Sequence, residues 1–109
     1  MAKHEFGVMQ EMPKPSVRYD VYEPHKYNCI SVDDDYIEKI AHELKEIDLY
    51  WHSVDVPRKG ISYCGITLIP PASLEQMIGV IQTFGALLPL QRLLEKAVHE
   101  KKWVIHFGL

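Results

Sequence analysis

Apolar residues recur at helical spacing in three segments of the chain. The first segment is 33–48, and its apolar positions, three and four residues apart, are Ile37, Ile40, Ala41, Leu44 and Ile47. Such a stripe is the buried side of an amphipathic helix. A second stripe follows in 73–84, and a third in the run LQRLLEKAVHEK after Pro89. Since Pro89 would break helical hydrogen bonding within one long helix, we expect a new helix to start near it.

Four other segments are rich in β-branched and aromatic residues, which is typical of strands. These segments are 26–32, 49–54, 61–69 and 102–109. Residues 1–25 contain three prolines and no regular period, so the sequence predicts an extended N-terminal arm ahead of a single α+β domain, residues 26–109. Within the arm, the alternation in VRYDVY, residues 17–22, allows one short edge strand.

The order of these elements is β-α-β-β-α-α-β. It matches the ferredoxin-like split β-α-β-β-α-β arrangement, in which a four-stranded antiparallel sheet has helices on one face. Right-handed crossovers would put 26–32 and 61–69 at the centre of the sheet, with 49–54 and 102–109 at opposite edges. Because many unrelated functions share this topology, the fold class carries no function by itself.

Alternation along each strand sorts its residues between the helix-covered face and an open face. In the last two strands, the residues expected to face the helices are Cys64, Ile66, Leu68, Trp103, Ile105 and Phe107. The faces of 49–54 stay open, because a slip of one residue in register exchanges them. The side chains expected on the open face, as an interface or ligand site, are Tyr27, Cys29, Tyr50, His52, Tyr63, Thr67 and His106.

Composition and charge narrow the classes of partner. The chain is 47% apolar and 25% charged, which is ordinary globular composition. Its formal net charge of −3 argues against binding a nucleic-acid backbone. No apolar run approaches the ~20 residues that cross a bilayer, and the first residues lack the apolar stretch of a secretory signal. Cys29 and Cys64 are too few for a disulfide framework, so we expect reduced thiols and a cytoplasmic protein.

The six histidines do not form a recognisable metal motif. No pair has the H-x-x-x-H spacing that places two ligands on one face of a helix. His52 and His106, on opposite edges of the expected sheet, would be about 14 Å apart, three strand spacings, which is too far for one ion. We therefore expect no metal and no cofactor.

Catalysis is the alternative that the open face allows. Nucleophilic catalysis would pair Cys29 or Ser31 with a base such as His52 or His106. However, a cysteine in the middle of a strand lacks the helix N-terminus that usually lowers a thiol pKa. General acid–base chemistry in a cavity closed by a second subunit is the better enzymatic interpretation, with the side chains Tyr27, Tyr63, His52 and His106.

The segment 33–48 contains seven acidic residues and two lysines. Its leading aspartates suit a helix N-terminus, and a solvated helix face accounts for the remaining charge. Docking of a basic partner on this helix is the alternative.

Taken together, these features favour a non-catalytic binding or interaction module of unknown ligand. It would self-associate as a homodimer through its open sheet face, or contact a partner protein or small ligand there. A small enzyme with a Tyr/His-lined cavity at a dimer interface is the first alternative, and an acidic docking protein is the second. The sequence names neither ligand nor partner.

Overall fold

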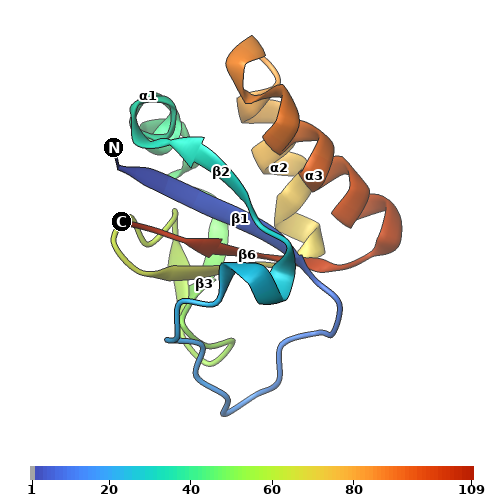
Figure 1. Cartoon of the computed structure of the whole chain (residues 1–109). Helices are drawn as coiled ribbons and strands as arrows, with labels where there is room; N and C mark the ends of the chain where they lie inside the picture. Colours follow the sequence, from blue (N-terminus) through green and yellow to red (C-terminus); the bar gives the residue numbers. More distant parts are fainter. Residues whose placement is uncertain (1) are drawn as a thin grey trace.

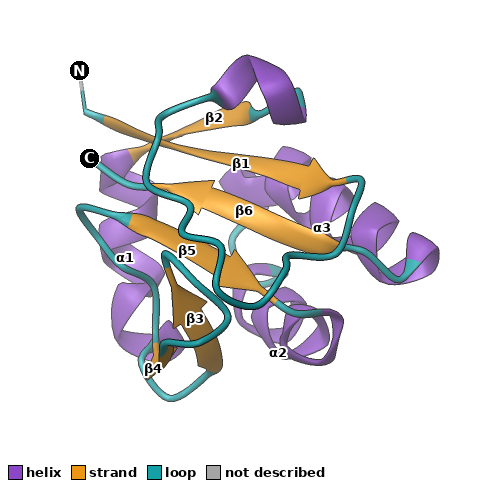
Figure 2. Ribbon diagram, turned by 90° about the horizontal axis from the view of Figure 1, so that it is seen from below, coloured by secondary structure: helices purple, strands orange, loops and turns teal. Residues whose placement is uncertain are grey.

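The computed structural model describes residues 2–109 and contains one six-stranded antiparallel sheet with three helices. The strands are β1 (Lys3–Met9), β2 (Ile30–Asp33), β3 (Asp48–Trp51), β4 (Pro57–Lys59), β5 (Ile66–Ile69) and β6 (Trp103–Phe107). The helices are α1 (Asp34–Leu44), α2 (Pro71–Ile81) and α3 (Leu88–Glu100), with 3-10 turns η1 (Pro24–Tyr27) and η2 (Gly85–Leu87). The strand order across the sheet is β2-β1-β6-β5-β3-β4 (Figure 2).

The three predicted helices are confirmed, and they lie together on one face of the sheet (Figure 1). α1 buries the predicted stripe at Ile37, Ile40 and Leu44 against the strands. Pro89 lies in the first turn of α3, where its missing N–H is not needed for a helical hydrogen bond. None of the helices in residues 2–109 has both the length and the apolar character that crossing a membrane requires.

The prediction of a four-stranded ferredoxin-like sheet is wrong, because two strands, β1 and β4, were not recognised from the sequence. Lys3–Met9 lies within the segment expected to be an arm, yet it forms β1 and pairs with both β2 and β6. β6 is consequently central, and β2 lies at an edge. β1 was missed because its buried face begins with the polar His4 and its other face ends with the buried Gly7 and Met9, so polar and apolar residues do not alternate regularly along it. The edge strand predicted at 17–22 is loop.

The second face of the sheet is covered by the chain itself, not left open. Residues 10–29 pass across it as a loop, which Figure 2 shows in front of the strands. Tyr19 and Tyr27 from this covering segment pack on an apolar cluster made of Met9, Ile66, Leu68, Ile105 and Phe107. The sheet therefore has a core on both sides, a large one under the helices and a smaller one under residues 10–29.

The faces predicted for β5 and β6 are reversed. Ile66, Leu68, Ile105 and Phe107 belong to the cluster under residues 10–29 and do not face the helices. Thr67 and His106 point to the helix side instead, and both are fully buried. Alternation could not settle this, since both faces of these strands are covered and the apolar set does not mark the helix side. In β3, whose faces the sequence left open, Leu49 lies under the helices and Tyr50 lies on the opposite face.

Candidate functional site

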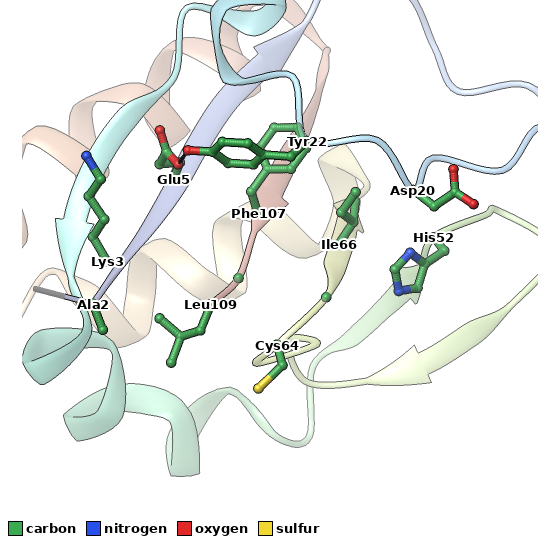
Figure 3. Close-up of a pocket in the computed structure, with 12 residues that line it drawn as sticks. Ala2, Lys3, Glu5, Asp20, Tyr22, His52, Cys64, Ile66, Phe107 and Leu109 are labelled. Carbon is green, nitrogen blue, oxygen red and sulfur yellow. Dashed lines mark hydrogen bonds between the residues drawn. The ribbon is translucent and has the colours of Figure 1, made fainter.

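A cleft of about 610 Å³ lies on the sheet face opposite the helices, at the end where β1 begins and β6 ends (Figure 3). This volume is in the range of small-molecule sites. Its lining residues are Ala2, Lys3, Glu5, Asp20, Tyr22, His52, Cys64, Gly65, Ile66, Phe107, Gly108 and Leu109. A more polar hollow of about 870 Å³ adjoins it beyond Glu5 and Tyr22, but that hollow lacks a buried apolar floor.

The floor of the cleft is apolar and belongs to two paired strands. Ile66 of β5 lies opposite Phe107 of β6 in the antiparallel register, and both side chains are buried. Gly108 comes directly after β6 in the sequence and packs against the loop that precedes β5. Its N–H donates to the carbonyl of Gly65 at 2.7 Å. A side chain at Gly108 would collide with the backbone carbonyl of Tyr63, so this close approach requires glycine.

One wall of the cleft is formed by Glu5 of β1 and Tyr22 of the covering segment. The Tyr22 hydroxyl donates to the Glu5 carboxylate, and this hydrogen bond raises the pKa of Tyr22. The Tyr22 ring meets Phe107 edge-on, with ring centroids 5.4 Å apart and an angle of 83° between planes. Figure 3 shows Lys3 and Glu5 on one side of the floor, with Tyr22 over Phe107.

The opposite wall is His52, which directly follows β3. Its backbone is tied on both sides, because its N–H donates to the Ile66 carbonyl at 3.0 Å and its carbonyl accepts from Tyr19 N–H at 2.6 Å. The imidazole Nδ1 lies 3.1 Å from the Tyr19 carbonyl. Figure 3 shows Asp20 beside His52, and the sulfur of Cys64 turned away from the imidazole. Cys64 is therefore not aligned with this histidine as a nucleophile.

Behind the floor, on the helix side of the same strands, lies a chain of buried polar side chains. His4 Nε2 is 2.9 Å from Asp34 Oδ1, and His4 Nδ1 is 2.8 Å from His106 Nε2. His106 Nδ1 lies 3.1 Å from Thr67 Oγ1, which itself accepts a hydrogen bond from Ser62 N–H at 2.8 Å. This hydrogen-bond network links β1, β5, β6 and the first turn of α1. Along the strands, its residues alternate with those that line the cleft.

The proton positions in this chain follow from its two ends. The Asp34 carboxylate accepts, so His4 Nε2 carries a hydrogen and, when His4 is neutral, its Nδ1 accepts from His106 Nε2–H. His106 Nδ1 then accepts from the Thr67 hydroxyl. Burial, followed by the influence of His4, lowers the pKa of His106 to about 3. Hydrogen bonds from Tyr63 and His4 lower the pKa of Asp34.

The chain of histidines is closed to solvent, since His4 and His106 are both fully buried. Every member of a satisfied buried network restrains the position of the next, which favours one packing arrangement over its competitors. The network thus fixes the register of the strands that carry the cleft floor. It does not present a reactive group to a substrate.

The residues that the sequence singled out are dispersed. The structure brings together His106, Thr67 and Tyr63. His106 and Thr67 are members of the buried network, and Tyr63 joins it by donating to Asp34 and by meeting the His4 ring edge-on. Tyr27 and Cys29 belong to the covering segment and pack on the apolar cluster beneath it, and Tyr50 packs on Trp103. Of the seven, His52 alone lines the cleft.

The structure separates two pairs of residues that the catalytic hypotheses would bring together. Cys29 packs against the apolar cluster on the face opposite the helices, whereas His106 lies on the helix side, so the two do not face each other. Burial raises the pKa of Cys29 to about 12, which suppresses the nucleophilic thiolate. His52 lines the cleft, whereas His106 lies on the helix side, so the two side chains are on opposite faces of the sheet.

Several important residues were missed from the sequence. His4 was counted with the scattered histidines, although His4, Phe6 and Val8 alternate along one strand face. Asp34 was interpreted as a helix-terminus charge, but its carboxylate binds His4 and Tyr63. Nothing local in the sequence indicates the Glu5–Tyr22 wall, which joins β1 to a loop. Residues 2–109 contain no cluster of three or more His, Cys, Asp or Glu side chains placed to hold a metal ion.

No protein-family model, no curated protein and no solved structure matches this chain.

Proposed function

We propose that this protein is a non-catalytic binding module, and that the cleft over Ile66 and Phe107 takes a small ligand with an apolar body. The observation that carries the proposal is the combination of a buried apolar floor with a few polar groups at the rim. An apolar pocket with a few fixed polar groups is the usual form of a small-molecule site. The buried network behind the floor supports this role, because a rigid floor lowers the entropic cost of binding.

The chemistry of the cleft favours binding over catalysis. Cys64 is exposed at the rim and its sulfur is turned away from His52, so the two do not form a nucleophile–base pair. The carboxylate of Glu5 is engaged by Tyr22, and that of Asp20 pairs with Arg18 at 3.1 Å. The rim groups are therefore suited to orienting a ligand.

Self-association and docking of a basic partner receive less support than ligand binding. Self-association through the sheet face is less compatible with this arrangement, because residues 10–29 already cover that face. The edge strand β4 also consists of Pro57, Arg58 and Lys59, which oppose pairing with a second sheet. Docking of a basic partner on the acidic face of α1 stays a prediction.

A thermal-shift screen of small metabolites and aromatic fragments tests the proposal. A ligand present at about 100 times its Kd adds about 2.7 kcal/mol to the free energy of unfolding, which is a clear rise in Tm. The variant Cys64→Trp places a bulky side chain at the rim and should abolish the shift. The matched control Thr83→Trp introduces a tryptophan at an exposed position after α2, away from the cleft, and should retain the ligand-induced rise in Tm.

If no compound raises the Tm, or if both tryptophan variants retain the full shift, the cleft is not the binding site.

A further inference from the structure

His52 has a backbone conformation that side chains rarely adopt. Its φ is 63°, in the left-handed region, and it is neither glycine nor asparagine. A residue other than glycine is strained there and persists only where its surroundings fix it. Three hydrogen bonds do so here, two through its backbone to Ile66 and Tyr19 and one through its ring to Tyr19. A strained residue fixed in this way at the wall of a cleft points to a role for its side chain.

The hydrogen bond to Tyr19 determines the tautomer of His52. A backbone carbonyl only accepts, so Nδ1 carries the hydrogen and Nε2 of the neutral ring is an acceptor. None of the side-chain hydrogen bonds within residues 2–109 involves Nε2, because the only one made by the His52 ring is through Nδ1. A Cβ added at Gly65 would lie 2.8 Å from Nε2 and 2.5 Å from Ser62 Oγ, so only glycine leaves space beside this nitrogen on the side of the floor.

The charges around the cleft select against anions. Its lining has one cation, Lys3, and two carboxylates, Glu5 and Asp20, with His52 as a further acceptor. Figure 3 shows Asp20 and His52 on the same side of the floor, and the Asp20 carboxylate also pairs with Arg18 at 3.1 Å, which partly offsets its charge. Acceptors are satisfied by ligand donors, and an anionic group placed here would meet like charge.

We propose that His52 is the specificity-determining residue of the cleft, and that its Nε2 accepts a hydrogen bond from an N–H or O–H group of a flat, neutral or cationic ligand lying on Ile66 and Phe107. This inference rests on the proposed binding function. The ligand class is then an aromatic or planar molecule with a donor at one edge, and an amine adds to its affinity through Asp20. An anionic analogue of the same shape is rejected.

Four bicyclic probes of similar shape separate these contributions. Indole has a ring N–H, whereas benzothiophene replaces it with a sulfur that cannot donate. Tryptamine adds an ammonium group to indole, and indole-3-acetate adds a carboxylate. Binding is measured by following the backbone amides of Gly65 and Gly108 in ¹H–¹⁵N spectra during titration.

We expect indole to bind about five-fold more tightly than benzothiophene, the ratio that one hydrogen bond typically gives. Tryptamine should bind more tightly than indole-3-acetate by a larger factor at low salt. The variant His52→Asn keeps a residue that tolerates the left-handed conformation but is too short to place an acceptor at the same point. In it the ratio of indole to benzothiophene should fall to about one, with benzothiophene binding unchanged.

The variant Asp20→Asn serves as the matched control. It should reduce the preference for tryptamine over indole-3-acetate and leave the ratio of indole to benzothiophene as it was. A merely structural role for His52 predicts something different, namely that His52→Asn weakens all four probes by the same factor.

The outcomes separate the two proposals. If the probes bind in the cleft with equal affinities, or if His52→Asn weakens all of them equally, the role of His52 is overturned while the binding function stands. If none of the four shifts the cleft amides, this inference fails, and the proposed function is then decided by its own broader screen.

Discussion

Acid should destabilise this protein through the buried histidine pair, and the size of the effect follows from the pKa of His106. Burial holds the folded-state pKa of His106 near 3, against an ordinary value of 6.5. A histidine whose pKa is lowered by folding contributes its full stabilisation at pH values above its pKa in the unfolded chain. That contribution is lost as the pH falls from there toward the folded-state pKa. Below about pH 6.5 this histidine is protonated in the unfolded chain but stays neutral in the folded chain, so the free energy of unfolding falls by about 1.4 kcal/mol per pH unit.

Between pH 6.5 and 4.5 the expected loss is therefore about 2–3 kcal/mol, a large part of the stability of a domain of this size. The lowered pKa of Asp34 has the same sign but acts mainly below this range, since an ordinary Asp titrates near ~3.9. Urea unfolding followed by circular dichroism at pH 6.5, 5.5 and 4.5 measures the slope directly.

The variant His106→Leu isolates the cause. It leaves His4 Nδ1 and Thr67 Oγ1 without their buried partner, at about 1–3 kcal/mol each, so it should be less stable at neutral pH. Its stability should also depend on pH more weakly by about 1.4 kcal/mol per unit, because the titrating group is gone. The exposed His99 provides the control, and His99→Gln should keep the slope of the original protein. A flat profile in the original chain, or an unchanged slope in His106→Leu, would refute the reasoning.

Two further predictions concern other parts of the sheet. Burial raises the pKa of Cys29 to about 12, so iodoacetamide at pH 8 should modify only the exposed Cys64 in the folded protein. In denaturant it should modify both thiols, and mass spectrometry counts the modified sites. Equal modification of the two thiols in the folded protein would contradict this. Gly7→Ala should lower the free energy of unfolding by about 1–3 kcal/mol, because its Cβ would lie 2.7 Å from both Cys29 Sγ and the Tyr27 carbonyl. Gly79→Ala, in α2 with nothing near its Cβ, should raise it by about 0.5–1 kcal/mol, and thermal melts that rank the two variants the other way would contradict the packing described.

The helices were predictable because each has one buried stripe at a clear period. Ile37, Ile40 and Leu44 pack on the core as their spacing indicates. The sheet was harder, because both of its faces are covered. In β5 and β6, residues 66–69 and 103–107, nearly every position is buried, and alternation then gives no choice between faces.

The candidate site was less predictable than the fold. His52 was named from its position in an aromatic strand segment, but its left-handed backbone depends on hydrogen bonds to Tyr19, more than thirty residues away in sequence. The buried network has the same character, since His4 and His106 lie at opposite ends of the chain and meet only because β1 and β6 pair. Long-range pairing of this kind leaves no local pattern in the sequence.

The most direct test of the central claim is to find where a bound fragment lies. A ¹H–¹⁵N titration with indole should shift the amides of Gly65, Phe107 and Gly108 together, along one saturating curve, and leave the amides of α3 unmoved. That result would place the ligand over the floor formed by β5 and β6, on the face opposite the helices. Saturating shifts confined to the helices, with the cleft amides unchanged, would contradict the account.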